Sequence, residues 1–270
     1  MTVEKSFLKK LGRWTQVVAG VLLCCLYAHK LRILPLTAQS SEPLPSPPAP
    51  ICEAMGHHES ISLPDGSSQL ELNSGACITM EFHGTTRIVR LLSGEAIFQV
   101  IPDPRRPFRV ETGPISIVDI GTKFDVYRTE LSTRVSVSEG AVQIPSGDAN
   151  VQPLRALQQV DIPDDTVQHR VRRPITLGDF DRMTAWVHGD IELEQQTLRE
   201  AMTEFARYQP IHFDFADPAI AEVKVSGVFP VTGVESFLRT LKPTCIHGDY
   251  DKVTQQIKFT STAGKQIICQ

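Results

Sequence analysis

The sequence lacks the patterns that carry most enzyme and metal chemistry. It has no C-x-x-C, no H-E-x-x-H, no phosphate-binding loop, no G-x-G-x-x-G and no Ser-His-Asp order. His57 and His58 are adjacent, and neighbouring residues of an extended chain point to opposite sides, so these two are poorly placed to share a metal. We therefore predict a protein that is not an enzyme and that holds no metal and no cofactor.

An excess of positive charge is missing as well. The chain has 27 lysines and arginines against 31 aspartates and glutamates, for a formal net charge of −4. No stripe of basic residues alternates with aromatic ones, so nucleic acid is not an expected partner. With 41% hydrophobic and 21% charged residues in 270, the composition is ordinary for one or two globular domains.

Long apolar runs are scarce, and residues 14–28 form the single one, WTQVVAGVLLCCLYA. Fifteen helical residues rise about 22 Å, but Lys30 and Arg32 can snorkel and extend the span to residues 14–34, enough for one transmembrane helix. Basic residues are concentrated before the run, which predicts that residues 1–13 are cytoplasmic and the bulk of the chain lies outside. A cleaved signal peptide is the alternative, which the poor cleavage sites disfavour.

Residues 35–54 are rich in proline and contain almost nothing to bury, which predicts an extended linker. After it, apolar and polar residues alternate in short runs separated by turn residues, as around Pro64-Asp65-Gly66 and Gly140. We expect an all-β domain over residues 55–163, a twisted and solenoid-like stack of strands that ends in a strand at residues 154–160.

A different period begins after residue 163. A connector over residues 164–184 leads to a predicted α+β module at residues 185–262 and a tail at 263–270. Its first helix, residues 194–208, carries an apolar stripe, and Thr232 with Glu235 predicts a capping box at the start of a second. Alternating strands are expected at 189–193, 211–215, 223–229 and near Ile246, which gives the order βαβ-βαβ.

Three segments of the β domain resemble the signature blocks of the ferric-citrate regulator (FecR) family, in that family's order and spacing. They are LLSGEAIFQV at residues 91–100, RPFRV at 106–110 and IGTKFDV at 120–126. In the C-terminal module, Trp186 and residues 206–208 and 226–229 resemble the short domain at the N-termini of secretins and TonB-dependent transducers. The two resemblances together span about residues 55–260.

The FecR resemblance implies a single-pass inner-membrane protein of Gram-negative bacteria with its bulk in the periplasm. Family members relay siderophore occupancy of a TonB-dependent outer-membrane receptor to an extracytoplasmic-function sigma factor. The implied partners are the receptor's signalling domain, the sigma factor and an intramembrane protease. The alternative is a cell-envelope scaffold or secretion-apparatus component.

The family's sigma-binding domain has no counterpart before Trp14, since about a dozen residues are too short for it. We expect that this domain is a separate polypeptide, that the true start lies upstream, or that the protein acts only in the periplasm. Direct contact with a sigma factor depends on which of these three holds.

Gly121-Thr122 is the one step where the chain could cut itself. A threonine hydroxyl can attack the preceding carbonyl and convert the amide to an ester, and glycine at that carbonyl lowers the steric barrier. Some members of the FecR family are processed at the matching step. The alternative is a simple turn before a strand, where glycine is common.

Two segments are candidate docking sites for a partner. Residues 223–229 resemble an edge strand, with Val223, Val225, Gly227 and Phe229 on one side and Pro230 ending the ladder. Arg105 and Arg106 follow Asp103-Pro104; they form either part of a docking face or a solvated surface pair with the aspartate.

Four cysteines lie downstream of the apolar run, at Cys52, Cys77, Cys245 and Cys269. On an oxidising side of the membrane they could form two disulfides, in any of three connectivities. We favour Cys52–Cys77 and Cys245–Cys269 because each pair flanks a compact segment. Four free thiols, partly buried, are the alternative.

Overall fold

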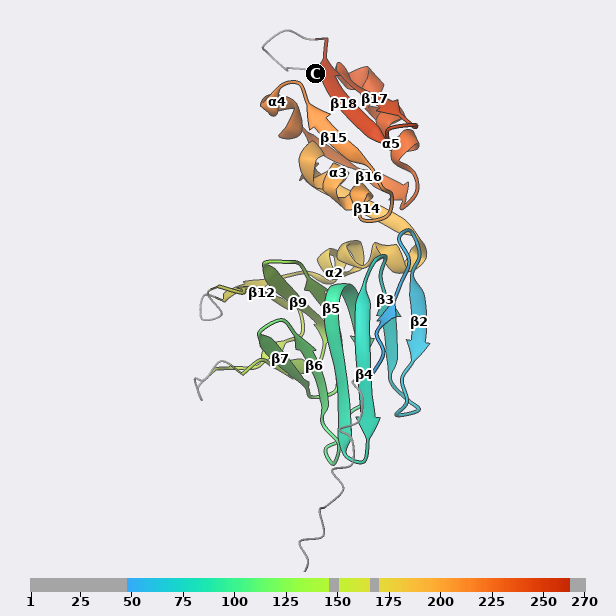
Figure 1. The fold of residues 1–270 in the computed structure, drawn as a ribbon. Coiled ribbons are helices and arrows are strands. Elements are labelled where there is room, and N and C mark those ends of the chain that lie inside the picture. The colour runs from blue at the N-terminus through green and yellow to red at the C-terminus, as the bar shows by residue number, and fades with distance from the viewer. Residues whose placement is uncertain (1–47, 146–150, 166–169, 263–270) are drawn as a thin grey trace, which may run out of the picture. The chain divides into compact units, whose positions relative to one another are not determined.

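The computed structural model describes residues 48–145, 151–165 and 170–262 (Figure 1). The predicted segments at 1–13 and 14–34, most of the linker at 35–54 and the tail at 263–270 lie outside these ranges. Within the ranges described, none of the helices has the length and apolar character that a bilayer crossing requires.

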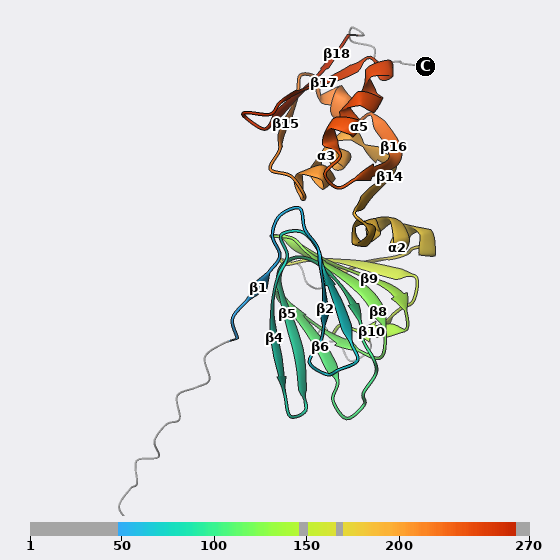
Figure 2. The same ribbon diagram turned by 90° about the vertical axis from the view of Figure 1, so that its right-hand side faces the viewer.

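The first part of the described chain is a curled sheet of thirteen strands, which we call the β lobe (Figures 1 and 2). Most neighbouring strands are antiparallel, and β5 with β6 is the exception. The strands are β1 (Ile51–Cys52), β2 (Glu59–Ser62), β3 (Gln69–Leu72), β4 (Cys77–His83), β5 (Thr86–Gln99), β6 (Phe108–Thr112), β7 (Ile115–Asp119), β8 (Lys123–Arg128), β9 (Ser132–Glu139), β10 (Ala141–Gln143), β11 (Leu154–Arg155), β12 (Gln158–Pro163) and β13 (Val171–Pro174).

The long strand β5 organises this sheet. Its first half pairs with β4 and β6, and its second half pairs with β3 and β8. Gly94 lies where the partners change and has a φ of 82°. The predicted all-β character is confirmed, but the strands do not repeat as a solenoid, since the order is β11-β10-β7-β6-β5-β8-β9-β12-β13.

The concave side of the sheet encloses an apolar core. Because side chains alternate between the two faces of a strand, Phe98 and Phe124 from paired strands meet there, with ring centroids 5.1 Å apart. Both are fully buried, as are Phe108 and Val137. The alternation of apolar and polar residues in the sequence therefore predicts these strands and their buried face.

The rest of the chain is a smaller α+β lobe, with a short connecting helix before it. Figure 2 shows helices α3 and α5 side by side between the sheets β14-β16 and β15-β18-β17. The elements are α2 (Leu177–Met183), η1 (Ala185–His188), β14 (Asp190–Thr197), α3 (Leu198–Ala206), β15 (His212–Phe215), α4 (Pro218–Ala221), β16 (Lys224–Pro230), α5 (Val234–Leu241), η2 (Lys242–Thr244), β17 (Ile246–Asp251) and β18 (Gln256–Ser261).

Several predicted boundaries are wrong. Residues 154–160 form two strands rather than one, because Leu157 has a φ of 60° and turns the chain. The helix predicted from residue 194 begins at Leu198, where Thr197 and Glu200 form a capping box. The capping box predicted at Thr232 is absent, and Gly233 is the N-cap of α5 without a side-chain hydrogen bond.

The predicted connector, residues 164–184, contains regular structure where it is described. β13 pairs with β12 at the edge of the sheet, and α2 begins with a capping box between Thr176 and Asp179. Because β13 has no side chain that is buried, the alternation of apolar and polar residues could not reveal it.

Candidate functional site

The Gly121-Thr122 step lies in the turn between β7 and β8. Gly121 has a φ of 95°, which favours glycine, and its amide donates to Oδ2 of Asp119 over 2.8 Å. A Cβ on Gly140 would come within 2.2 Å of the Gly121 carbonyl oxygen, so the β9–β10 turn lies directly against that carbonyl. Thr122 is buried, and its Oγ1 has no hydrogen-bond partner among the described residues.

Asp119 is the titratable group of this turn. Burial raises its pKa to about 6, although the hydrogen bond from Gly121 and the charge of Arg87 offset part of the shift. Its Oδ1 also lacks a partner within the described residues. Because the folded pKa lies above the ordinary value, the protonated carboxyl favours the fold below pH 4, and this contribution is lost as the pH rises through 6.

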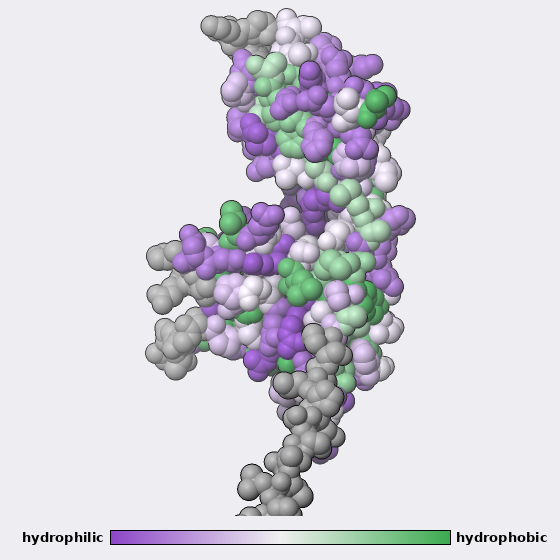
Figure 3. All heavy atoms as spheres, viewed as in Figure 1, coloured by the Kyte–Doolittle hydropathy of each residue, from purple (hydrophilic) through white to green (hydrophobic). Residues whose placement is uncertain are grey.

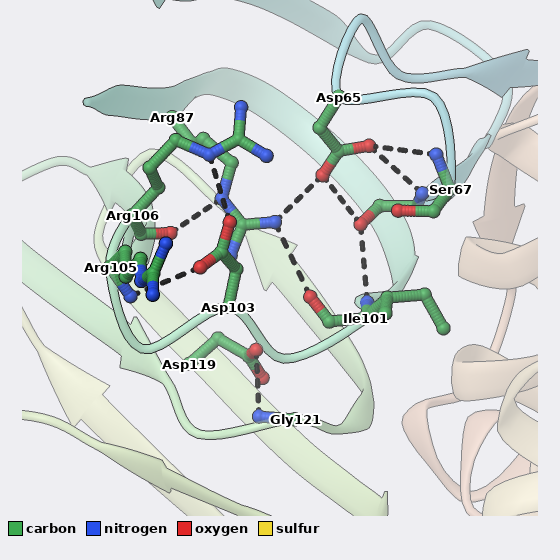
Figure 4. A network of polar contacts seen from close by, with 10 residues as sticks. Asp65, Ser67, Arg87, Ile101, Asp103, Arg105, Arg106, Asp119 and Gly121 are labelled. Carbon is green, nitrogen blue, oxygen red and sulfur yellow. Dashed lines mark hydrogen bonds and ion pairs between the residues drawn. The ribbon is translucent and has the colours of Figure 1, made fainter. Parts of the chain in front are cut away.

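A buried ion pair holds the loop beside this turn (Figure 4). Nη1 of Arg87 lies 2.8 Å from Oδ2 of Asp65, and both side chains are at most 2% exposed. Arg87 also donates to the carbonyl oxygens of Ile101 and Arg106, over 3.3 and 2.6 Å. Burial alone would raise the pKa of Asp65, but hydrogen bonds, chiefly from Ser68, lower it overall. The carboxylate therefore stays ionised opposite the guanidinium.

The loop that Arg87 anchors carries Arg105 and Arg106. Asp103 accepts from the Arg105 amide over 3.0 Å and from Nε of Arg106 over 2.8 Å (Figure 4). Of the two alternatives predicted for these arginines, this contact with Asp103 corresponds to the solvated surface pair. A Cβ on Gly121 would lie 2.9 Å from Cβ of Pro102, so the structure brings the arginine loop and the Gly121-Thr122 turn together.

Self-cleavage at Gly121-Thr122 is a hypothesis that the purified chain can test. The Thr122 hydroxyl oxygen bonds to the Gly121 carbonyl carbon, its proton passes to the Thr122 nitrogen, and the amide C–N bond breaks, which leaves an ester and a free Thr122 amine. Water then hydrolyses this ester to a Gly121 carboxylate and the Thr122 hydroxyl. Mass spectrometry of the purified chain should find fragments 1–121 and 122–270. Thr122→Ser should still cleave because it keeps a hydroxyl, and Thr122→Ala should not. An intact wild-type chain would contradict the hypothesis.

The second predicted site, residues 223–229, corresponds to strand β16 of the α+β lobe. Among the described residues β16 pairs only with β14, so its other edge is open. Phe229 belongs to the core, Val223 and Val225 pack against it, and the Phe229 ring lies over Gly227. The exposed side chains are instead those of Lys224, Ser226 and Val228.

The register of β14 and β16 shows which amides face the open edge. Val231 donates to the Gly189 carbonyl and Leu198 donates to the Val223 carbonyl. Hydrogen-bonded and non-hydrogen-bonded pairs alternate along an antiparallel ladder, so the amide of Val225 faces β14. The amides of Lys224 and Val228 therefore point to the open edge.

The structure shows a polar contact between the two lobes that the sequence did not predict. Arg207, which ends α3, forms an ion pair with Glu95 of β5, and its guanidinium lies 4.6 Å from the ring centroid of Tyr127. Asn73 donates to Glu95 over 2.6 Å and to the Tyr208 hydroxyl over 3.1 Å. We call these five residues the polar joint. Glu95 and Arg207 are 112 positions apart, so no local pattern could pair them.

The structure describes three of the four cysteines that follow the apolar run. Cys52 and Cys77, on the paired strands β1 and β4, form a disulfide. This is the pairing that we favoured. Cys245 lies at the end of η2 as a free thiol, and its predicted partner Cys269 lies outside the described residues, so that second bond stays a prediction.

Comparison with known proteins finds a family match in the β lobe and two solved structures with a similar fold. The model of the FecR protein family matches residues 53–143. No curated protein matches the chain.

Two crystal structures of a candidate anti-sigma factor from Parabacteroides distasonis share the fold. The first is 22% identical, with a TM-score of 0.64 over 80% of this chain and 100% of that one. The second is 23% identical, with a TM-score of 0.63 over 80% and 99%. Residues 53–143 thus match the FecR family, and the fold of the larger part of the chain is that of these two structures.

Proposed function

We propose that this protein is a FecR-type signalling regulator of a sigma factor. The observation that supports this most is the FecR match over the β lobe, from residue 53 to residue 143. The fold shared with the candidate anti-sigma factor extends over 80% of the chain and so includes more than the matched segment. Together they support a role in the regulation of a sigma factor.

The finer proposal follows the FecR resemblance. The chain would be anchored in the inner membrane by residues 14–34, with both lobes in the periplasm and residues 1–13 in the cytoplasm. The α+β lobe, similar to the short domain of secretins and TonB-dependent transducers, would receive the signalling domain of a TonB-dependent siderophore receptor. The sigma factor would be reached directly or through a separate polypeptide.

The open edge of β16 is the docking surface that we favour on the α+β lobe. An unpaired strand edge can add a strand from a partner, with backbone hydrogen bonds supplying affinity. Pro230 at the end of the strand has no amide to leave unpaired, which suits an edge. On the face seen in Figure 3, polar residues divide the apolar surface into small patches, so this face offers no broad apolar docking surface.

Val228→Pro should weaken receptor binding at least about tenfold, because proline removes an outward-facing donor and its ring obstructs an added strand. The measurement is titration calorimetry with the receptor's signalling domain. Val228→Thr, which keeps the amide and the β-branched shape, is the matched control and should bind nearly as well as wild type. Val225→Pro is unsuitable, since its amide faces β14 and the lobe itself would be disrupted.

If folded Val228→Pro binds with unchanged affinity, docking lies elsewhere, and the loop with Arg105 and Arg106 is the next candidate. A receptor domain that does not bind the wild-type chain would contradict the receptor partnership.

The regulatory function has a separate test. Deleting the gene should change transcription from a reporter that depends on an extracytoplasmic-function sigma factor of the same cell, and restoring the full chain should reverse the change. An unchanged reporter together with a loss of secretin multimers would favour the secretion-apparatus alternative.

A further inference from the structure

Two buried carboxyl groups lie on the same face of the β lobe, under one guanidinium. Glu95 is paired in register with Tyr127, and Ile97 with Asp125. Asp125 is therefore the diagonal neighbour of Glu95, at the roughly 7–8 Å typical of such Cα pairs. Arg207, whose side chain is 16% exposed against 5% for Glu95, binds Glu95 from the α+β lobe.

Asp125 is deeply buried. It is 1% exposed, and its Oδ1 has no hydrogen-bond partner among the described residues. Ile97, paired with it in register, packs into the apolar core of the α+β lobe. The face of the sheet that carries Asp125 is therefore the face that the α+β lobe contacts.

The two guanidinium groups that act on Asp125, those of Arg134 and Arg207, are each bound to other carboxylates. Arg134 of β9 is engaged by Asp161 of β12, and Arg207 is shared between Glu95 and Glu204. The other titratable groups on the elements packed around this face are Glu71, Lys123, Tyr127, Asp181, Arg182, Asp190, Glu192, Arg199, Glu200, Tyr208, His58 and His188.

Burial raises the pKa of Asp125 well above its ordinary value, and the neighbouring charge of Glu95 raises it further. Arg134 and Arg207 only offset part of this shift. The buried environment of Asp125 therefore favours protonation more strongly than water does. Separation of the lobes would let water reach the carboxyl and return its pKa toward the ordinary value.

We propose that the polar joint is a proton-linked hinge, which is closed when Asp125 is protonated and opens when Glu95 and Asp125 are both charged. Because the closed state has the higher pKa, the proton's contribution to closure is complete below the ordinary pKa of about 4 and is lost as the pH rises through the closed-state value. Rising periplasmic pH would therefore release the α+β lobe from the β lobe, whichever partner docks there.

The test measures the distance between the lobes as the pH is changed. Nitroxide labels are attached to keto amino acids introduced at Leu131 and Val253, which are 78% and 92% exposed, in the full chain in detergent. Pulsed electron spin resonance then gives the distance distribution from pH 5 to pH 9. The ratio of open to closed molecules should rise with pH by up to about tenfold per unit, the limit for one proton.

Asp125→Asn keeps the size of the side chain without its charge, so this variant should stay closed at every pH. Glu95→Gln leaves Arg207 for Asp125 alone and should also remove the pH response. Asp119→Asn, which alters a buried carboxyl of β7 outside the joint, is the matched control and should respond like wild type.

Three results would overturn the proposal. The first is a wild-type distribution that does not change with pH. The second is a pH response that survives in folded Asp125→Asn or, should that variant fail to fold, in Glu95→Gln. The third is a response that Asp119→Asn abolishes.

Discussion

Arg207→Met should lower the free energy of unfolding by about 3–5 kcal/mol at pH 7, the usual loss when one partner of a buried ion pair is removed. Glu95, 5% exposed in the wild-type chain, would lose its guanidinium partner, and Tyr127 would lose its cation–π contact. Urea denaturation of the full chain, followed by circular dichroism, measures this loss. The effect should exceed that of any exposed arginine in the chain.

Arg199→Met is the matched control because Arg199 lies on the same helix, α3, and is exposed. It should cost only about 0.5–1 kcal/mol, the value of its cation–π contact with Phe215. In the Arg207→Met background, Glu95→Gln should recover stability, since the neutral amide needs no counter-charge. If Arg207→Met and Arg199→Met lose the same stability, the polar joint is not a buried ion pair in solution.

Gly94→Ala should cost about 2–5 kcal/mol, which combines an unfavourable φ of 82° with a steric clash. The added Cβ would lie 2.5 Å from Cα of Ala76 and 2.6 Å from its Cβ. Ala76 lies in the turn between β3 and β4, so the clash would push this turn away from β5. Thermal melting of the purified chain would show the loss as a lower Tm.

Gly75→Ala separates the two contributions. Gly75 has a φ of 67°, but nothing lies within 4 Å of an added Cβ, so only the conformational cost of about 1–2 kcal/mol should appear. Equal losses at Gly94 and Gly75 would show that Ala76 moves aside and that the close approach costs nothing.

The elements that could be predicted from the sequence are those whose signal is local. Alternation found the strands around Phe98, Phe108 and Phe124, and a helical stripe of period 3.6 found α3. Pro64-Asp65-Gly66 marked the turn between β2 and β3 because turn residues act within four positions. The FecR resemblance rested on the same stretch of short strands that the family model matches.

Functional sites are less predictable from the sequence. The sequence named Gly121-Thr122 and Arg105-Arg106 separately, and the structure shows that their two loops meet. It named Val223, Val225 and Phe229 as a docking strand, whereas their side chains face the core of their own lobe. Alternation says that a strand has two faces, but only packing decides which of them is covered.

By itself, the sequence determined a β-rich lobe followed by an α+β lobe, and it favoured a Cys52–Cys77 pairing among several alternatives that only the structure decided. Tertiary structure alone decided the strand order around β5 and the pairing of Glu95 with Arg207 across the lobes. Periodicity and turn chemistry act over a few residues, whereas strand neighbours and buried charge partners are chosen by contacts between residues far apart in the chain. The environment of Asp125 is of the second kind, because its register partner Ile97 packs into the core of the α+β lobe.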